Sequence, residues 1–437
     1  MKNKSTKNQY DFSGFSKLNY SERLEKLKNN LVLTEEDVKF FKSGGIQSPD
    51  LGENFVENLL GYFQIPMGVA TNFCIDGQDY LIPMAVEETS IIAAASKTAK
   101  WVRENGEIKT EVLGREIIGQ IQFAKVSHFA TFESLVLTKQ DDFIRMANLE
   151  VAFGLVARGG GVTRLSVREL KRDDGFSMAV IHVYMNPCDA MGANIINQVC
   201  EFLKNPLQDL TQETVTMCIL TNLVDSKLTK STVTINQIDM ELAHKIEEAS
   251  RFAELDSYRA ATNNKGVLNG IDPILIATGN DWRAVEAGVH AYACRDGKYG
   301  SITKWRVVGN TLVGELIAPL VVGIVGGVTS LHPAAKISLK MMQITSAEQL
   351  SKIIASVGLV QNLGALKALT TVGIIEGHMK LHVKNLSLGA GATEKEMPFV
   401  VKKLEEILAT TKRITQANAI EVVNDFRKIS NTDDKVK

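Results

Sequence analysis

The sequence predicts an α+β protein, in which a large, mostly helical domain carries an inserted ferredoxin-like unit and is followed by a small, mobile helical flap. The insertion is predicted because strands and helices alternate after residue 116 in the order βαββαβ, the order of ferredoxin-like domains. The flap is predicted because charged and apolar positions alternate at helical period at 394–429, after a glycine-rich joint. We therefore expect the large domain at 1–112 and 224–375, the ferredoxin-like unit at 113–223 and the flap at 376–437.

The individual elements follow from the same periodicities. Residues 20–112 should hold short helices, including a helical run at 87–101. The ferredoxin-like unit should contain, in order, strand 116–126, helix 131–147, strands 163–170 and 176–185, helix 190–205 and strand 213–223. An amphipathic helix at 237–258 opens the second part of the large domain. The uncharged run at 316–331 falls short of the roughly 20 residues of a membrane span and contains Pro319, so it indicates buried strands and turns.

Composition and charge exclude several classes of protein. Apolar residues make up 45% and charged residues 23% of the 437 residues, which is typical of globular proteins. The net charge of -1 creates no field that would attract nucleic acid or an anionic membrane. The five cysteines lack C-x-x-C spacing, so neither a disulfide framework nor a thiolate zinc site is indicated. A reducing, cytoplasmic compartment fits, and the start of the chain has no apolar segment typical of a secretory signal.

Two glycine turns are candidate phosphate sites. Asp189 stands between a predicted strand and a predicted helix, where it could be the N-cap of the helix. Alternatively, Asp189, Gly192 and the free N–H groups of the first helical turn form a phosphate-binding site. The stretch ARGGGVTR contains Gly160, Gly161 and Arg164, and it is either a solvated basic edge or a nucleotide-phosphate site. Neither turn has the G-x-G-x-x-G spacing of a Rossmann site.

Three charged residues stand at the ends of apolar elements. Glu88 begins a helix, where an acidic residue complements the helix dipole. Lys265 stands in an otherwise uncharged turn that is followed by strand-like residues. Asp281 precedes an amphipathic helix and would be a good N-cap. Each of the three is structural when taken singly, but burial of all three together would couple their charges strongly.

Two histidines, His378 and His382, are four residues apart, so on a helix both imidazoles would face one side. Met379 stands where the metalloprotease signature has Glu, and no acidic third ligand follows at a fixed spacing. We therefore expect no metal, although a metal hydrolase is a competing interpretation. An RNA-binding role for the ferredoxin-like unit is disfavoured because its candidate central strands lack exposed aromatic residues.

Seven segments, in order along nearly the whole chain, resemble the 3-hydroxy-3-methylglutaryl-CoA (HMG-CoA) reductase family, and within it the soluble class II enzymes of bacteria and archaea. They are ENLLGYFQIPMGVA, PMAVEETSIIAAAS, DAMGANIINQ, NNKGVLNGIDP, ATGNDWRAVEAG, GGVTSLHP and GHMKLH. The resemblance implies a large domain built around a central helix, with a ferredoxin-like cofactor domain inserted in it. It also implies a homodimer, or a higher assembly of dimers, whose active sites lie at the subunit interface with ENLLG at the junction.

The resemblance also assigns residues to the site. The catalytic positions of the family fall on Glu88, Lys265, Asp281 and His378. Positions near the hydroxymethylglutaryl end of the substrate fall on Ser90, Arg259, Asn269 and Asn362. The nucleotide positions fall on the turn from Asp189 through Met191 and Gly192 to Asn194, and Gly160, Gly161 and Arg164 are added to it.

The implied reaction reduces HMG-CoA to mevalonate and coenzyme A with two hydrides, or runs in the reverse direction. Lys265 would stabilise the negative oxygen and Glu88 would protonate the reduced aldehyde oxygen, while Asp281 would hold both in register. His378, on the hinged flap, would protonate the departing coenzyme A thiolate. Arg164 takes the place of the acidic residue that binds the ribose in NADH-using relatives, so NADPH is predicted over NADH.

Overall fold

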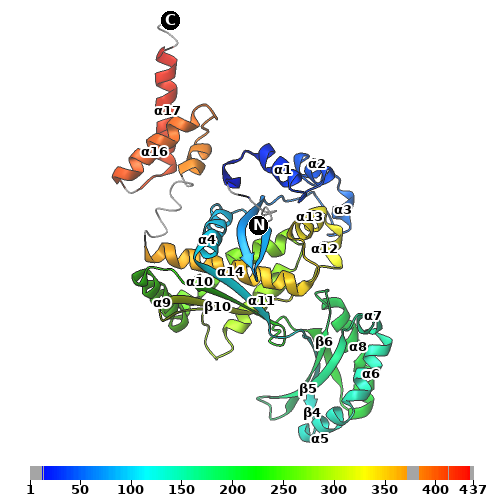
Figure 1. The fold of residues 1–437 in the computed structure, drawn as a ribbon. Helices are drawn as coiled ribbons and strands as arrows, with labels where there is room; N and C mark the ends of the chain where they lie inside the picture. The colour runs from blue at the N-terminus through cyan, green and yellow to red at the C-terminus, as the bar shows by residue number, and fades with distance from the viewer. Residues whose placement is uncertain (1–11, 13, 372–382, 412, 434–437) are drawn as a thin grey trace, which may run out of the picture. The chain divides into compact units, whose positions relative to one another are not determined.

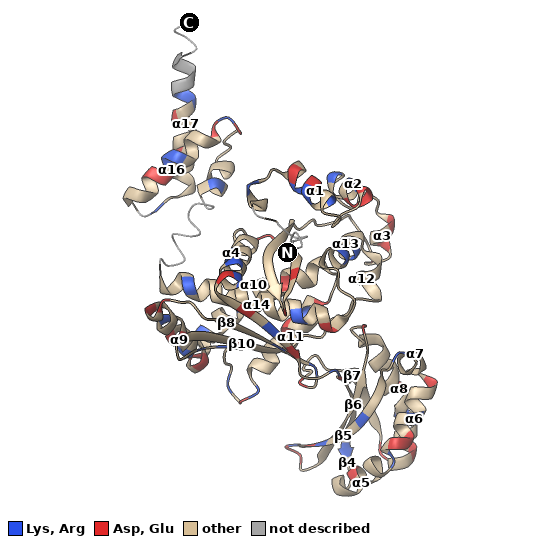
Figure 2. Ribbon diagram, viewed as in Figure 1, with Lys and Arg blue, Asp and Glu red and all other residues tan. Residues whose placement is uncertain are grey.

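The computed structural model describes residue 12 and residues 14–371, 383–411 and 413–433 (Figure 1). The chain divides into two compact units, one made of residues 1–87 and 91–364 and the other of residues 88–90 and 365–437. Lysine, arginine and acidic residues are interspersed along the helices and strands of the described part (Figure 2), as the net charge of -1 leads us to expect. The predicted α+β class is confirmed.

The N-terminal part of the first unit consists of short helices and a hairpin. The helices are η1 (Phe15–Lys17), α1 (Tyr20–Asn29), α2 (Glu35–Lys42) and α3 (Asp50–Glu53), and the hairpin strands are β1 (Met67–Ile75) and β2 (Gln78–Ala85). Helices α1 and α2 begin where the sequence offers capping boxes, at Asn19 with Glu22 and at Thr34 with Asp37. The predicted helical run after Glu88 is α4 (Ile91–Asn105), which packs on β1.

A four-stranded antiparallel sheet and two long helices form the centre of the large domain. The strands are β3 (Gly106–Val112), β8 (Leu228–Ile235), β10 (Thr311–Pro319) and β9 (Thr303–Val308), in that spatial order. The surrounding helices are α9 (Met240–Leu255), α10 (Ser257–Ala277), α11 (Trp282–Ala293), α12 (Gly327–Leu331), α13 (Pro333–Met342) and α14 (Ala347–Thr370).

Helices α10 and α14 cross at a close distance because glycines lie at the contact. A Cβ on Gly270 of α10 would lie 2.8 Å from the carbonyl oxygen of Val357, and a Cβ on Gly358 of α14 would lie 2.9 Å from the side chain of Ile271. Helix α14 is long and apolar enough to span a membrane by length and composition, but 67% of its most apolar stretch is buried inside the protein. The core helix of a globular protein has the same properties.

The ferredoxin-like unit has the predicted topology. Its elements are β4 (Ile117–Val126), α5 (Phe129–Thr138), α6 (Gln140–Glu150), α7 (Phe153–Val156), β5 (Gly161–Lys171), β6 (Ser177–Asn186), α8 (Ala193–Thr211) and β7 (Val215–Leu220). The strands form an antiparallel sheet in the order β5-β6-β4-β7, and α5, α6 and α8 pack on it (Figure 1). The single helix predicted at 131–147 is wrong. It is two helices that meet at Lys139, because Asp141 and Asp142 complement the dipole at the start of a new helix.

Two neighbouring segments join the ferredoxin-like unit to the large domain. One follows β3 and the other precedes β8, and these two strands pair with each other. The segments continue that pairing, because the Leu113 N–H donates to the Leu228 carbonyl oxygen at 2.8 Å and the Ser226 hydroxyl donates to the Glu116 carbonyl oxygen at 2.7 Å. The unit is therefore an insertion with both connections at one place, while its exact predicted boundaries stay a prediction.

The described C-terminal part of the second unit is helical, as predicted. A helical stretch at 383–389 is followed by α16 (Met397–Thr411) and α17 (Gln416–Asp433). Its own small core contains Val383, Val400, Leu404 and Val423. Arg427 of α17 donates to Glu396 ahead of α16 at 2.7 Å, and this contact lowers the pKa of Glu396 to about 2.

Candidate active site

Lys265 lies in the middle of α10, the central helix, and the predicted turn followed by strand-like residues is therefore wrong. Asparagine and glycine favour turns over helices when only local preferences act. Here a buried hydrogen-bond network outweighs those preferences, since Asn263 and Asn264 are both buried and bonded to distant parts of the fold. Asn269 follows Lys265 by four residues, so the two side chains lie on one face of the helix.

The first half of this network joins α10 to α14. The Trp305 indole N–H donates to Oδ1 of Asn362 at 2.8 Å, and Nδ2 of Asn362 donates to Oδ1 of Asn263 at 2.8 Å. Asn362 is 2% exposed, and both the oxygen and the nitrogen of its amide bond to protein groups. This fixes α14 against α10 next to Lys265, and direct contact of Asn362 with the substrate stays a prediction.

The second half of the network joins α10 to α11. Nδ2 of Asn264 donates to the Tyr299 hydroxyl at 3.1 Å and to the Gly300 carbonyl oxygen at 2.9 Å. The Tyr299 hydroxyl also lies 2.8 Å from Nδ1 of His290 on α11. Burial raises the pKa of Tyr299, which keeps its hydroxyl protonated and able to donate. Lys265 therefore projects from a stretch of helix that is held on two sides.

Asp281 caps α11, as predicted. Its Oδ1 accepts the backbone N–H groups of Arg283 at 3.1 Å and Ala284 at 3.2 Å. The preceding residue, Asn280, is buried, and its Oδ1 accepts the Gly323 N–H at 2.8 Å. Gly323 packs in turn on the turn that contains Met191, because a Cβ on Gly323 would lie 2.5 Å from the Met191 nitrogen.

The coupling of the three charged residues by burial stays a prediction. Glu88 and Lys265 are exposed, and the Asp281 side chain is 37% exposed. Ser90 has a left-handed backbone with φ of 77°, and its buried hydroxyl has no hydrogen-bond partner within the described residues. Arg259 lies in the first turn of α10, and burial lowers its pKa, which indicates that its guanidinium is partly removed from water.

The glycine turn at Gly160 contacts the residues that directly precede the second predicted phosphate turn. A Cβ on Gly160 would lie 2.5 Å from the Asn186 carbonyl oxygen and 2.6 Å from the Cys188 sulfur, so only glycine fits there. Gly161 has φ of 108°, and the following residue is held by the Asn148 amide, which both donates to and accepts from its backbone. The structure thus brings together two segments that are about 30 residues apart in the sequence.

The predicted role of Asp189 as the N-cap of the following helix is wrong. Gly192 occupies the N-cap of α8 in a left-handed conformation with φ of 92°. A Cβ at Gly192 would lie 2.4 Å from the side chain of Ile117, so this glycine permits a close approach. Oδ1 of Asp189 instead accepts the N–H of Ala347 at 2.9 Å, at the start of α14. The first N–H groups of α8, which include that of Asn194, are left for a ligand or water.

Arg164 is paired and stacked within the ferredoxin-like unit. Its Nη2 lies 2.8 Å and its Nε 3.1 Å from the Glu116 carboxylate, and its guanidinium lies 3.2 Å from the centre of the Tyr184 ring. Nearby, Nη1 of Arg168 lies 3.3 Å from Nε2 of His182. Burial, followed by the charge of Arg168, lowers the pKa of His182, so its neutral ring accepts this hydrogen bond.

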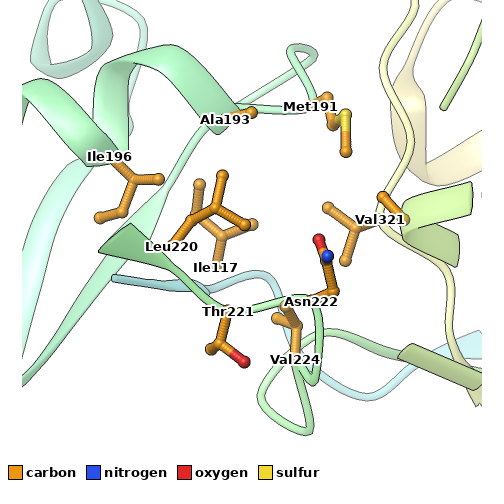
Figure 3. A pocket seen from close by; sticks show the side chains of 10 residues that line it. Ile117, Met191, Ala193, Ile196, Leu220, Thr221, Asn222, Val224 and Val321 are labelled. Atoms are coloured by element: carbon orange, nitrogen blue, oxygen red, sulfur yellow. The ribbon is translucent and has the colours of Figure 1, made fainter. Parts of the chain in front are cut away.

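An apolar pocket lies between the DAMG turn (Asp189 to Gly192) and the first turn of α11 (Figure 3). Its polar lining comes from Thr221 and Asn222, which the sequence analysis missed although they directly follow a strand that ends at the site. The full lining is Ile117, Met191, Ala193, Ile196, Leu220, Thr221, Asn222, Val224, Ala284 and Val321. The pocket joins one of the predicted nucleotide turns to the helix that Asp281 caps.

Two further predictions concern the pair of histidines and the absence of a metal ion. His378 and His382 lie outside the described residues. Among the described residues, no group of three or more His, Cys, Asp or Glu side chains could hold a metal ion.

Comparison with known proteins identifies the family. Residues 19–383 match the model of the hydroxymethylglutaryl-coenzyme A reductase family. The chain is 41% identical over 419 residues to the 3-hydroxy-3-methylglutaryl-coenzyme A reductase of Archaeoglobus fulgidus, covering 95% of this chain and 94% of that protein. A probable HMG-CoA reductase of Borreliella burgdorferi is 34% identical over 84% of each chain.

Solved structures agree with the sequence comparison. An HMG-CoA reductase from Streptococcus pneumoniae superposes with a TM-score of 0.81 at 37% identity, covering 95% of this chain and all of that chain. A second structure from that organism, described as the class II enzyme bound to NADPH in open conformations, has a TM-score of 0.80 at 37% identity and covers 83% of this chain. The fold and these likenesses define an oxidoreductase with an inserted ferredoxin-like unit. The chain belongs to the hydroxymethylglutaryl-coenzyme A reductase family, and within it to the class II type of bacteria and archaea.

Proposed function

We propose that this chain reduces HMG-CoA to mevalonate and coenzyme A, using two molecules of NADPH. The observation that supports the proposal is the connected path from the DAMG turn through Gly323 and Asn280 to Asp281, which links the predicted nucleotide turn to the predicted catalytic carboxylate. The coenzyme supplies two hydrides when it is bound. The residues of the chain supply charge, protons and orientation.

Lys265 acts on the oxygen that becomes negative each time a hydride reaches the carbonyl carbon. An ammonium aimed at that oxygen lowers both barriers, because negative charge develops there in both transition states. Its position in the central helix supports this role. The two asparagines directly before it are hydrogen-bonded to other parts of the fold, so the helix cannot shift without breaking these bonds.

The two proton transfers need separate donors. After the first hydride, the C–S bond of the hemithioacetal breaks, and His378 protonates the coenzyme A thiolate that leaves. After the second hydride, Glu88 gives a proton to the alcohol oxygen of mevalonate. Asp281 orients Lys265 and Glu88. Ser90, Arg259, Asn269 and Asn362 bind the hydroxymethylglutaryl end, where an anionic group would offset the desolvation of the partly buried Arg259 guanidinium.

The coenzyme lies along the two touching turns. Gly160, Gly161 and Gly192 allow its pyrophosphate to approach the backbone, and the first N–H groups of α8 bind it. Arg164 releases Glu116 and binds the 2′-phosphate of NADPH instead. A doubly charged phosphate is a stronger partner for a guanidinium than one carboxylate.

The functional assembly is a cytoplasmic homodimer, or a higher assembly of dimers, with the active site at the interface. Two large apolar side chains of the segment ENLLGYF support this, because Leu60 is fully exposed and Phe63 is 94% exposed in the single chain. The exposure of Lys265 supports it too. A partner subunit would bury these groups and so create the low-dielectric site that the chemistry needs.

The test is to mix purified protein with HMG-CoA and NADPH or NADH, and to follow nicotinamide absorbance together with free thiol. We expect two molecules of coenzyme oxidised for each coenzyme A released, with a higher kcat/KM for NADPH. Absence of turnover with both coenzymes overturns the function. A clear preference for NADH overturns only the role of Arg164.

The role of His378 is tested by measuring each half-reaction in the His378→Gln variant. We expect reduction of the thioester to be lost and reduction of free mevaldehyde to be largely kept, because only the first releases a thiolate. If both rates fall equally, His378 has another role.

A further inference from the structure

A hydrogen-bonded chain of three side chains, Asn264, Tyr299 and His290, joins α10 to α11. Nδ2 of Asn264 donates to the Tyr299 hydroxyl at 3.1 Å, and that hydroxyl lies 2.8 Å from Nδ1 of His290. The phenol and imidazole rings also stack, with their centres 5.9 Å apart and their planes at 29°. Asn264 directly precedes Lys265, and His290 lies in the last turn of α11. The chain therefore connects the turn that carries Lys265 to the far end of the helix that Asp281 caps.

The hydrogen bonds of this chain run in one direction. The backbone N–H of Ile302 donates to Oδ1 of Asn264 at 3.2 Å, and Nδ2 of Asn264 donates to the carbonyl oxygen of Gly300 at 2.9 Å. A backbone N–H only donates and a carbonyl oxygen only accepts, so these two contacts fix which end of the amide is the nitrogen. The second hydrogen of that nitrogen goes to the Tyr299 hydroxyl, whose own proton is then available for Nδ1 of His290. His290 therefore accepts at Nδ1, and its ring proton lies on Nε2.

Burial makes this chain hard to break. Asn264 is 0% exposed, and its oxygen and nitrogen both bond to other parts of the fold. In such a water-poor place an amide hydrogen that loses its partner finds no water to replace it, which is costly. Burial also raises the pKa of Tyr299, so the phenol keeps the proton that it donates. The three side chains therefore stay connected in the folded protein.

Helix α11 is held at both of its ends. At its start, directly before Asp281, Oδ1 of the buried Asn280 accepts the N–H of Gly323 at 2.8 Å. At its other end, His290 accepts the proton of the Tyr299 hydroxyl. A helix of 12 residues is a rod about 18 Å long, so a shift at either end moves the carboxylate of Asp281. The contact at His290 thus helps to set where Asp281 stands relative to the central helix.

We propose that His290 and Tyr299 are positioning residues for the reaction, and that their hydrogen bond keeps Lys265 of α10 in register with Asp281 of α11. This proposal rests on the proposed function, because it takes Lys265 and Asp281 as groups that act in the reaction. In this role neither His290 nor Tyr299 contacts the substrate or the coenzyme. Their loss should slow both hydride transfers, since Lys265 acts in both, without weakening the binding of HMG-CoA or NADPH.

The first test is Tyr299→Phe, which removes one oxygen atom and keeps the ring beside His290. We expect kcat for thioester reduction and for mevaldehyde reduction to fall about tenfold, a large effect for one lost hydrogen bond, while KM for each substrate stays unchanged. The matched control is Tyr292→Phe, a tyrosine of α11 whose ring contacts Arg295, and it should keep wild-type kcat. Wild-type kcat in a folded Tyr299→Phe overturns the proposal.

Variants at His290 test the direction of the hydrogen bond. His290→Asn keeps an oxygen acceptor at the place of Nδ1 and should keep kcat within a few-fold of wild type. His290→Ala should fall as far as Tyr299→Phe, and the variant with both changes should fall no further, because the two groups act through one bond. Additive losses, or a His290→Asn protein as slow as His290→Ala, overturn the proposal. Should His290→Ala not fold, Tyr299→Phe and His290→Asn carry the test.

The place of the proton on His290 can be measured without turnover. Nitrogen-15 chemical shifts of histidine-labelled protein, assigned by their loss in His290→Asn, distinguish the two forms of the neutral ring. We expect the proton of His290 on Nε2. A proton on Nδ1 contradicts the direction of the chain and overturns the positioning role.

A Lys265→Met background separates positioning from general support of the fold. In that background Tyr299→Phe should cost no further activity in single-turnover reduction, because the charge that the chain aims is already absent. A further loss as large as in the wild type would show that the hydrogen bond only supports the fold, and the positioning role is then wrong. A wild type without turnover overturns the proposed function itself. Turnover in the wild type with unchanged kcat in Tyr299→Phe overturns the positioning role alone.

Discussion

Lys265 is the residue on which the proposed chemistry depends most directly. Replacement by methionine keeps the length of the side chain and the packing of α10 but removes the positive charge. We expect kcat to fall by a factor of about 100 to 1000, since loss of one oxyanion stabiliser costs about 3–4 kcal/mol. The loss should affect both thioester reduction and mevaldehyde reduction.

The measurement is single-turnover reduction of each substrate, with NADPH binding titrated in parallel. Lys265→Arg is the matched variant, because it keeps a positive charge at the same position. If Lys265→Met slows only the thioester step, the ammonium does not stabilise both oxyanions.

Asp272 is a second residue whose charge state matters. It lies on α10 and faces Glu286 of α11, and burial followed by the Glu286 charge raises its pKa to about 8. Its Oδ1 is buried without a hydrogen-bond partner among the described residues. The folded protein thus keeps a proton on this pair that the unfolded chain releases near pH 4.

The sign of the pH dependence follows from this difference. A group whose pKa is raised by folding stabilises the protein fully below its unfolded pKa, and that stability is lost as pH rises through the folded pKa. We expect the free energy of unfolding of the wild type to fall between pH 5 and 8, by at most about 1.4 kcal/mol per pH unit. Asp272→Asn should show a shallower slope in urea unfolding. Equal slopes in the two proteins would contradict the assignment.

At the scale of elements, the ferredoxin-like unit could be predicted and the central helix could not. Strands β4 and β5 largely alternate buried and more exposed positions, whereas β6 is a nearly continuous buried run, and both patterns are local. Helix α10 contains asparagines and a glycine beside Lys265, and its stability comes from partners such as Asn362 and Tyr299. Such partners are far away in the sequence, so only tertiary structure reveals the helix.

The same distinction explains the error at Asp189 and the partners of Arg164 that were not predicted. A strand followed by Asp and Gly is typical of an N-cap, yet Asp189 caps α14, which begins 158 residues later. The sequence shows that Arg164 is a basic residue close to a glycine turn. It does not predict that Glu116 and Tyr184 contact its guanidinium. A local sequence pattern predicts which helix or strand contains a residue. The residue that it bonds to depends on which helices and strands pack together in the folded chain.

The contact between the two glycine turns makes a prediction for Gly160. An alanine there would place its Cβ 2.5 Å from the Asn186 carbonyl oxygen, so the turn must move away from the DAMG segment. We expect Gly160→Ala to weaken NADPH binding by about tenfold, a typical cost of disturbing residues in contact. HMG-CoA binding should not change.

Gly154→Ala provides the matched control, because Gly154 lies in α7 of the same unit and a Cβ there meets nothing within 4 Å. Isothermal titration of NADPH into each variant measures the effect. Wild-type affinity in Gly160→Ala would show that the contact between the turns is not needed for the coenzyme.

At the scale of the whole molecule, the exposed apolar side chains of ENLLGYF predict association between copies of the chain. Leu60 is fully exposed, and transfer of a leucine side chain from water to an interface is worth about 1.5–3 kcal/mol. Leu60→Asp places a charge at the proposed junction, and a charge at the centre of an interface is strongly disfavoured. We expect the variant to sediment as a monomer with native helix content. Turnover should be lost together with the dimer, because the proposed active site is complete only between two subunits.

Leu31→Asp is the control for this experiment, because Leu31 is also a highly exposed leucine, at 84%. It lies between α1 and α2, away from the segment ENLLGYF, in a left-handed conformation that aspartate tolerates. It should remain a dimer with full activity. The decisive comparison is the concentration dependence of specific activity in the Leu60→Asp protein. If activity returns at the concentrations where sedimentation shows the dimer to re-form, the site belongs to the interface. A stable monomer with wild-type turnover would instead place every catalytic group within one chain.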